Sequence, residues 1–415
     1  MTDDSSRMPA ANDPSRVIEQ VIEAATPRLV ALRRDLHAHP ETGFDTHRTA
    51  GVVAQGLEAL GLSVQSGVGR TGVVAEIEGG APGPCLILRA DMDALPIEER
   101  TGLDYASTTP GQMHACGHDI HTSALLGAAE ALVRIAPHLA GRVRLVFQPA
   151  EETLDSGAAA MIADGVAQGA DMAVSFHNQP DLAAGELRLV RGSGTASSDE
   201  FSVTVTGKSG HAARPDQAAD PIVGAAYMIT QLQTIVSRRM RPADPLVLTV
   251  GQISGGFTEN IIPDTCSFIG TVRCRTAATR DMAEAAFREI CGSVARAQGL
   301  EAQVSYVRGV PPLVNDGGLL AQAERSFAAQ FSAPPHIVPG EDFGSEDFAW
   351  FSEILPTLQF HVGSGQPGRD DRLHNSDYQP DERSIPTGAT AMARLALDLL
   401  APDRDDRAPS QTEAS

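Results

Sequence analysis

Residues 85–93 read CLILRADMD, a short β-rich run that ends in two aspartates. The same order of a β-rich run followed by polar residues returns at 142–152, RVRLVFQPAEE, and at 171–177, DMAVSFH. A helical pattern of small residues lies between the first two runs, at about 119–136. Strands that alternate with helices predict an α/β layer around a largely parallel sheet, in which sites form at the carboxyl ends of the strands.

The rest of the chain divides around this centre. Apolar spacing predicts a helix or a kinked pair at 16–38, with Pro27 as the interruption, and helices at 47–60 and 385–400. From residue 199 the order changes to β-α-β-β-α-β, the ferredoxin-like arrangement, which is complete within about 110 residues and can therefore be an insertion. We predict a catalytic domain in two parts, 14–192 and 311–402, an inserted lid or dimerisation domain at 193–310, and disordered tails at 1–13 and 403–415.

Composition restricts the classes of protein that the chain can belong to. The 415 residues suffice for two domains, and the formal charge of −21 argues against nucleic acid and anionic membranes as partners. No apolar run approaches the roughly 18 residues that span a bilayer. The polar, acidic start MTDDSSRMPAANDPS does not resemble a secretory signal, so we expect a cytoplasmic protein. Five scattered cysteines predict buried thiols rather than disulfides, with Cys116 as the exception.

Metal-binding residue types gather where predicted strands end. Taken singly, each has an ordinary explanation, since a lone histidine is usually hydrogen-bonded and a glutamate pair is usually solvated. Their joint placement is different, because cysteine, histidine and carboxylate are the standard ligands of Zn²⁺ and similar ions, and the carboxyl ends of these strands should converge. The sequence therefore predicts a metal site among the donors of these segments: Asp91 and Asp93, then His114, Cys116, His118 and His121 in MHACGHDIH, then Glu151 and Glu152, His177, and His374.

The segment Cys116-Gly117-His118 admits three interpretations: a buried thiol beside a capping histidine, a nucleophilic Cys–His pair, or two metal ligands. The small glycine allows both side chains to turn toward one point, and the start of a helix lowers a thiol pKa toward the metal-binding thiolate. We favour ligands, because a nucleophile would leave the other donors without a role. In the glutamate pair, one carboxylate can bind metal while its neighbour acts as general base.

Several further motifs then identify a family resemblance. The segments DMDALP, MHACGHDIHT, the EE pair, HNQP, GKSGHAARP, GGFTENIIPD, GTVR, GSEDF and LHNSDY resemble, from about residue 28 to 400, those of the aminoacylase/carboxypeptidase metallopeptidase family. The most similar branch holds hippurate hydrolases, indole-acetyl-amino-acid hydrolases and N-acyl-amino-acid deacetylases. The resemblance implies a zinc-exopeptidase-like fold, a mixed and largely parallel sheet flanked by helices, with an inserted ferredoxin-like α+β domain.

The resemblance also implies roles for individual residues. It matches Glu151 to the general base and His211 to an insert-domain histidine that polarises the scissile carbonyl. It matches Asp93 to an acid that orients a metal-bound histidine, and Asp91 is a weaker candidate for the same orienting role. It matches the ligands of the binuclear centre to Cys116, His118, Glu152, His177 and His374. It matches the insert-domain residues that reach the substrate to Asn260 and Arg273. One departure is NSDY at 375–378, where relatives carry a proline and then an aromatic residue.

The expected function follows from this set. We predict a metal-dependent amidohydrolase that cuts N-acetyl, benzoyl or aryl-acetyl amino acids into a carboxylic acid and a free amino acid, using two Zn²⁺ or Mn²⁺ ions, with Co²⁺ or Ni²⁺ also suited to the donors. The alternatives are a carboxypeptidase or dipeptidase of the same mechanism and a metal-binding sensor without turnover, which the intact Glu151 disfavours. We also predict a homodimer through the inserted domain, with His211 reaching the partner's site. The alternatives are that His211 only caps the helix after its loop, or that the insert closes over the metals of its own chain.

Overall fold

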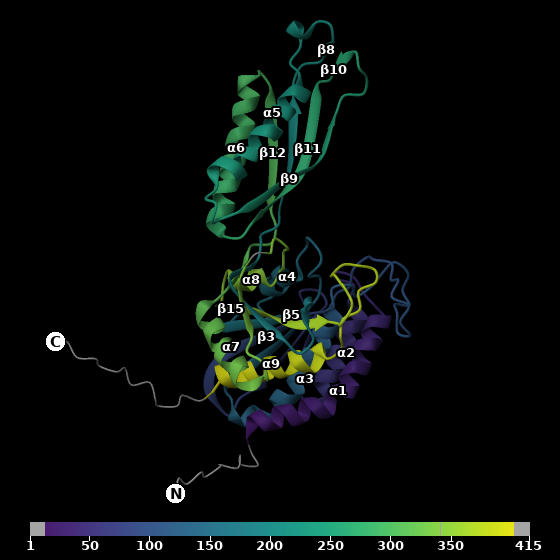
Figure 1. The fold of residues 1–415 in the computed structure, drawn as a ribbon, viewed down its shortest axis with the longest axis vertical. Coiled ribbons are helices and arrows are strands. Elements are labelled where there is room, and N and C mark those ends of the chain that lie inside the picture. Colours follow the sequence, from purple (N-terminus) through teal and green to yellow (C-terminus); the bar gives the residue numbers. More distant parts are fainter. Residues whose placement is uncertain (1–12, 341, 402–415) are drawn as a thin grey trace, which may run out of the picture. The chain divides into compact units, whose positions relative to one another are not determined.

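The computed structural model describes residues 13–340 and 342–401 of the chain, which form two compact units (Figure 1). Unit 1 holds the described residues up to Arg191, together with Asn315–Val338 and those from Ile354 onward; unit 2 holds Gly192–Val314 and Pro339–Glu353. The expected tails at 1–13 and 403–415 lie outside the described residues, apart from Asp13, which caps the first helix. Within the described ranges, no helix combines the length and apolarity needed to cross a membrane.

Unit 1 is built on a mixed sheet. Strands β4, β3, β5 and β15 are parallel, β1 and β2 extend one side antiparallel, and β6 pairs antiparallel with β15 on the other. This arrangement confirms the predicted fold class. The full order is β1 (Val64–Val68), β2 (Gly72–Glu78), β4 (Ala140–Gln148), β3 (Ala81–Asp91), β5 (Met172–Ala183), β15 (Thr357–Gly365), β6 (Leu187–Thr195) and β13 (Leu313–Asn315), and β14 (His336–Pro339) also pairs with β6.

Helices cover this sheet. The helices α3 and α9 contact its strands, and α1 packs against both helices (Figure 1). The segment around Pro27 forms one continuous helix rather than a kinked pair, since α1 runs unbroken through the proline. The helices of unit 1 are α1 (Pro14–Ala38), α2 (His47–Ala59), α3 (His118–Ile135), α4 (Gly157–Ala163), α7 (Gly317–Gln330) and α9 (Ser384–Leu399), with a 3-10 turn at Ala136–His138.

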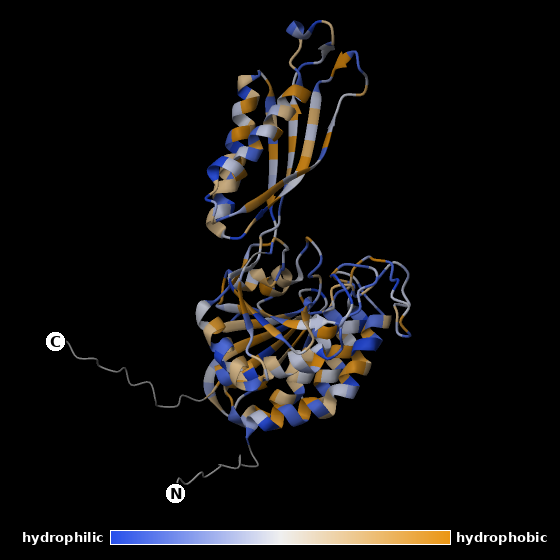
Figure 2. Cartoon of the chain, in the orientation of Figure 1, coloured by the Kyte–Doolittle hydropathy of each residue, from blue (hydrophilic) through white to orange (hydrophobic). Residues whose placement is uncertain are grey.

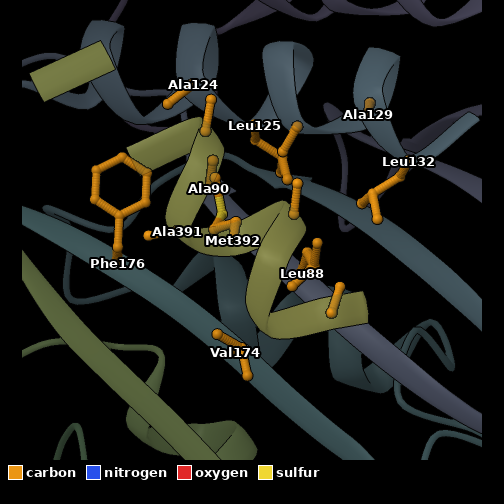
Figure 3. Close-up of a cluster of buried hydrophobic side chains, with 14 of the residues drawn as sticks. Leu88, Ala90, Ala124, Leu125, Ala129, Leu132, Val174, Phe176, Ala391 and Met392 are labelled. Carbon is orange, nitrogen blue, oxygen red and sulfur yellow. The ribbon is translucent and has the colours of Figure 1, made fainter. Parts of the chain in front are cut away.

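The core of unit 1 lies between the sheet and the helices α3 and α9. Leu88 of β3 and Phe176 of β5 face Leu125 of α3 and Met392 of α9, and all four side chains are fully buried (Figure 3). Alanines on the facing sides of both helices let their backbones approach the strands closely. The hydropathy colours show the same segregation, with apolar residues toward the sheet and polar residues outward (Figure 2). Burial of this apolar surface is the main favourable term in holding the helices on the sheet.

Unit 2 has the order that the sequence predicts for the insertion. Its four-stranded antiparallel sheet runs β12-β7-β11-β9, which is the ferredoxin-like order, and α5 and α6 pack on it. Its elements are β7 (Asp199–Thr206), β8 (Gly210–His211), α5 (Pro221–Thr234) with a π-helical turn at Ile235–Arg239, β9 (Leu246–Gly255), β10 (Ile261–Ile262), β11 (Thr265–Cys274), α6 (Ala277–Ala297), β12 (Glu301–Arg308) and α8 (Ala349–Ser352), with a 3-10 turn at Pro215–Gln217.

The register of the parallel strands places the polar segments together. Asp91 at the end of β3 pairs with Gln148 at the end of β4, so the residues that follow both strands leave the sheet at one edge. Pairing of β3 with β5 stops at Ser175, two residues before His177. His177 therefore lies beside this edge, although it is inside a strand. The strand β5 continues alongside β15 to Ala183, whereas the sequence predicts that it ends at residue 176.

Candidate metal centre

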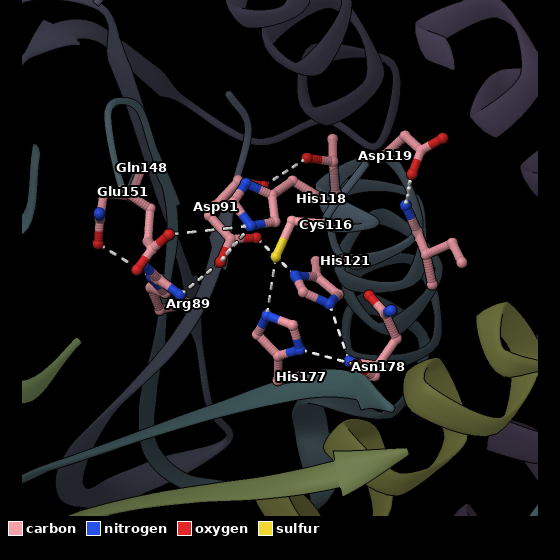
Figure 4. Close-up of polar contacts among 12 residues, drawn as sticks. Arg89, Asp91, Cys116, His118, Asp119, His121, Gln148, Glu151, His177 and Asn178 are labelled. Carbon is pink, nitrogen blue, oxygen red and sulfur yellow. Dashed lines mark hydrogen bonds and ion pairs between the residues drawn. The ribbon is translucent and has the colours of Figure 1, made fainter. Parts of the chain in front are cut away.

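Five predicted ligands from four segments converge in unit 1. Cys116, His118 and His177 form one group, and Cys116, Glu152 and His374 form a second, with one potential ligand atom from each residue within 4.8 Å of the others in its group. Cys116 belongs to both groups. Figure 4 shows its sulfur between the imidazoles of His118 and His177. Two overlapping groups that share a thiol form an arrangement suited to two neighbouring cations.

The ligand atoms of the cluster lie close enough together to bind shared cations. The Sγ of Cys116 lies 3.5 Å from Nε2 of His177, and Nε2 of His374 lies 3.0 Å from Oε1 of Glu152. The Nε2 of His118 is buried and makes no hydrogen bond to any described residue, although it lies 3.9 Å from Oε1 of Glu152. A buried nitrogen without a partner is costly unless another group satisfies it, and a thiol, imidazoles and carboxylates are the donor set of Zn²⁺.

The turn that carries Cys116 and His118 depends on a glycine. Gly117 caps the N-terminus of α3 with φ of +87°, a conformation that side chains other than hydrogen strongly disfavour. Burial, followed by the charges of Glu152 and Glu151, raises the pKa of the Cys116 thiol well above its usual range. This differs from the lowering that we expect from a helix start, because desolvation and two nearby carboxylates outweigh the helix dipole. A bound cation reverses that balance and favours the thiolate.

Asp93 links the glutamate pair to His118. Its two carboxylate oxygens accept the backbone N–H groups of Glu151 at 3.0 Å and Glu152 at 3.1 Å. Its Oδ1 also lies 3.4 Å from Nδ1 of His118, so that Nε2 is the ring nitrogen on the side of the carboxylates Glu151 and Glu152. Burial lowers the pKa of His118, but Asp91, Asp93 and Glu152 outweigh it and raise the pKa to about 10. This geometry suits the orienting role that the resemblance assigns to Asp93.

The two glutamates have different surroundings. Ala150, directly before them, has φ of +54°, a left-handed conformation that is uncommon for alanine and gives the backbone a sharp change of direction. Glu152 pairs with His374 and shares a group with Cys116, whereas Glu151 groups only with His118 and Glu152 among the residues of unit 1. Burial raises the pKa of Glu152, but the hydrogen bond to His374 and the charge of His118 lower it overall. Glu152 therefore lies beside the shared thiol of Cys116, whereas Glu151 lies next to His118 and Glu152 and belongs to neither group that contains the thiol.

His121 lies next to the cluster and forms a further group with Asp91 and His118, but its ring nitrogens have hydrogen-bond partners. Its Nδ1 lies 2.6 Å from the Asp91 carboxylate, and its Nε2 accepts the backbone N–H of Asn178 at 3.0 Å. Both ring nitrogens are therefore occupied. Asp91 also accepts a hydrogen bond from the guanidinium of Arg89 at 2.7 Å, so this aspartate links Arg89 to His121 next to the candidate ligands. Sequence analysis assigned no role to Arg89, Asn178 or Tyr378, although Asn178 lies in the motif HNQP and Tyr378 in the motif LHNSDY.

The three remaining candidates lie in unit 2. His211 in β8 pairs with Ile261 of β10, and the backbone N–H of Ala212 donates to the carbonyl oxygen of Asn260 at 3.1 Å, so His211 and Asn260 are neighbours. The Nδ1 of His211 accepts the N–H of Ala213 at 3.0 Å, which places the proton of a neutral ring on Nε2. Arg273 lies near the far end of the ten-residue strand β11, so unit 2 does not bring it to the other two.

Comparisons with known proteins agree with this geometry. Residues 87–398 match the sequence profile of peptidase family M20/M25/M40. The chain is 40% identical over 376 residues to N-acetyl-L-cysteine deacetylase from Bacillus subtilis, covering 90% of this chain and 88% of the relative. It is 34% identical over 373 residues to thermostable carboxypeptidase 2 from Saccharolobus solfataricus, covering 89% of this chain and 94% of the relative.

A solved structure of similar fold is that of the YXEP protein from Bacillus subtilis, described as a dinuclear metal binding peptidase from the M20 family. Its TM-score against this chain is 0.81 at 32% sequence identity, covering 91% of this chain and 99% of that one. The family match over residues 87–398 includes every segment that carries a candidate ligand.

Proposed function

The chain belongs to peptidase family M20/M25/M40 and is a metal-dependent hydrolase of amide bonds, and from that premise we propose that it hydrolyses N-acyl amino acids to a carboxylic acid and a free amino acid. The observation that carries this proposal is the meeting of five metal-ligating side chains with a second, adjacent carboxylate, that of Glu151. The name of the 40% identical relative, N-acetyl-L-cysteine deacetylase, points to acylated amino acids as the substrate class.

We propose that the site holds two divalent cations. Cations bound there would act as Lewis acids on the amide carbonyl and make water acidic enough to lose a proton near neutral pH. The thiol of Cys116 favours Zn²⁺, and Mn²⁺, Co²⁺ or Ni²⁺ also suit the mixed donors. The residues that would hold them are Cys116, His118, Glu152, His177 and His374, which form two groups around one sulfur.

Glu151 is the proposed proton carrier. Its side chain is 10% exposed, and its backbone is anchored by Asp93, so the carboxylate is both shielded and held in place. Glu151 accepts the proton of the attacking water and then delivers it to the nitrogen of the leaving amino acid. Glu152 is less suited to this task, because it already pairs with His374 at 3.0 Å and lies beside the thiol.

His211 is proposed to stabilise the developing negative charge on the carbonyl oxygen. A neutral ring whose Nδ1 accepts from Ala213 presents Nε2–H as a donor, the form needed to bind an oxyanion. We further propose that unit 2 mediates a homodimer in which this histidine serves the partner's site. The edge strand β9 supports this proposal, because it exposes backbone groups and Ile253, which is 51% exposed. The expected cytoplasmic location stays a prediction.

The experiment that tests the function is a substrate panel. N-acetyl, N-benzoyl and indole-acetyl amino acids should be hydrolysed in the presence of added Zn²⁺ or Mn²⁺, and a chelator should abolish the activity reversibly. Dipeptides and longer peptides with free amino termini test the alternative, a carboxypeptidase or dipeptidase, which the 34% identical relative brings into consideration. Hydrolysis of free peptides without hydrolysis of any N-acyl amino acid would reverse the order of these two proposals.

A further inference from the structure

A buried amide and a buried phenol connect the segments that carry the candidate ligands. We propose that Asn178 and Tyr378 are positioning residues: together they clamp the turn of Cys116 and Gly117 and set the spacing of the ligands Cys116, His177 and His374. The inference rests on the proposed metal centre. It concerns residues that hold the ligands in place rather than residues that bind the cations.

The side chain of Asn178 closes against the ligand-bearing turn. With its amide group facing that turn, Nδ2 donates to the carbonyl oxygens of Cys116 at 3.1 Å and Gly117 at 3.2 Å, and Oδ1 accepts from the hydroxyl of Tyr378 at 2.5 Å. The opposite orientation would set the amide oxygen against two carbonyl oxygens, which cannot donate. Asn178 is fully buried, so water cannot substitute for these partners.

The fit between Asn178 and the turn is tight. A methyl group placed on Gly117 would lie 2.3 Å from the terminal amide atom of Asn178 that faces the turn, closer than any real contact. Gly117 is therefore required both by its left-handed backbone and by the approach of this amide. Any movement of the amide consequently moves the turn that holds Cys116 and His118.

The backbone of Asn178 orients two histidines. Its carbonyl oxygen lies 2.8 Å from Nδ1 of His177, so that Nε2 is the nitrogen that faces Cys116 Sγ. Its N–H donates to Nε2 of His121, the ring that the Asp91 carboxylate holds from the other side. One buried residue thus contacts the turn, a candidate ligand and a supporting histidine.

Tyr378 connects the loop that carries His374 to the turn of Cys116 and Gly117. Its ring is fully buried against Met113 and Ala115, directly before the turn. The backbone N–H of His374 donates to the carbonyl oxygen of Ala115 at 2.8 Å, and His374 itself has a left-handed φ of +64°. The phenol hydroxyl reaches Asn178 and lies 3.3 Å from the hydroxyl of Ser364 on β15. Three of the four ligand segments therefore share one buried support.

The test is the substitution Tyr378→Phe, which keeps the ring and removes the hydroxyl. Loss of an outer partner of metal ligands typically lowers metal affinity by about 10–100-fold. We expect the Zn²⁺ dissociation constant, measured by competition with a chromophoric chelator, to rise at least about tenfold. The visible absorption spectrum of the Co²⁺-loaded protein should also change, because it reports ligand geometry. Asn178→Ser should act in the same direction and keeps the test open if the first variant does not fold.

The matched control is Tyr306→Phe in unit 2. It removes the hydroxyl of another phenol, one that is half-buried and donates to Asp199 at 3.0 Å, far along the chain from every candidate ligand. It should leave the Zn²⁺ affinity and the Co²⁺ spectrum unchanged. Wild-type affinity and spectrum in Tyr378→Phe, or equal weakening in both variants, would overturn the clamp. A wild-type protein that binds no divalent cation would instead refute the proposed metal centre itself.

Discussion

The carboxylate of Asp93 accepts the backbone N–H of Glu151 at 3.0 Å and so anchors the proposed general base at its main chain, not at its side chain. The side chain can therefore be changed without disturbing the anchor. Asp93 makes the same bond to Glu152, which keeps the proposed ligand in place when its neighbour is substituted. This separation allows the roles of the two glutamates to be tested independently.

We expect Glu151→Gln to lose about 10²–10⁴-fold in kcat, because the amide cannot accept the proton of the attacking water. Metal content, measured by elemental analysis, should stay at the wild-type level. The matched change Glu152→Gln should instead reduce metal content, since that carboxylate pairs with His374 and lies beside Cys116. Near-normal turnover of fully loaded Glu151→Gln would show that the assignment within the pair is wrong.

Cys116→Ser should weaken metal binding, with activity partly restored by excess cation. The reason is that Cys116 belongs to both groups of candidate ligands, and a hydroxyl is a poorer ligand than a thiolate. Titration with Zn²⁺, followed by activity, measures the shift. Cys85→Ser is the control, because Cys85 is also a buried free thiol of unit 1 but lies outside both groups. A covalent acyl adduct on Cys116, trapped during turnover, would favour the nucleophilic interpretation.

Metal affinity should rise with pH. Without a cation, the pKa of the Cys116 thiol is raised by burial and the pKa of His118 stands at about 10, so both groups carry protons at neutral pH. Binding must displace those protons, and the apparent Kd should fall about tenfold per pH unit for each proton displaced. The affinity is thus lost as the pH falls. Chelator competition between pH 6 and 8 checks the slope, and an affinity independent of pH would contradict this prediction.

His211→Ala mixed with Glu151→Gln tests whether the histidine acts on the partner's site. If subunits exchange and His211 works across the dimer, half of the dimers are mixed and each has one complete site. The activity should then recover to about a quarter of the wild-type value. If the histidine acts within its own chain, no site is complete and no activity returns. Tagged subunits, recovered together on one affinity resin, confirm that exchange has occurred.

Arg280→Ala should destabilise unit 2 by about 3–5 kcal/mol, because it leaves the buried carboxylate of Asp199 without its charge partner. The single tryptophan, Trp350, belongs to unit 2, and its fluorescence during urea unfolding reports on that unit. Arg239→Ala removes an ion pair whose partners are 40% and 64% exposed, and it should cost only about 0–1 kcal/mol. Equal midpoints for the two variants would show that the buried pair does not support the fold.

The sequence alone determined the order of the main elements and the identity of the candidate ligands. Helical and strand periodicities are local, so the runs at β3, β4, β5, α3 and the six elements of the ferredoxin-like sheet and its helices could be read directly. The segments that carry the candidate ligands were recognisable because their residue types are rare together and because parallel strands bring their ends to one edge, and the family resemblance then singled out the five residues. The short strands β1, β13 and β14 were missed, since nothing local distinguishes them from loops, and the nine-residue strand β6 was missed as well.

The tertiary structure decided which side chains are committed to which partners. His121 has the same residue type and the same segment as His118, yet only the contacts with Asp91 and Asn178, which lie 30 and 57 residues away in sequence, show that its nitrogens are occupied. Asn178 and Tyr378 meet across 200 residues. The raised pKa of the Cys116 thiol likewise results from burial and from carboxylates that other strands deliver. Hydrogen bonds and desolvation act through space, and distances in space are set only when the chain has packed.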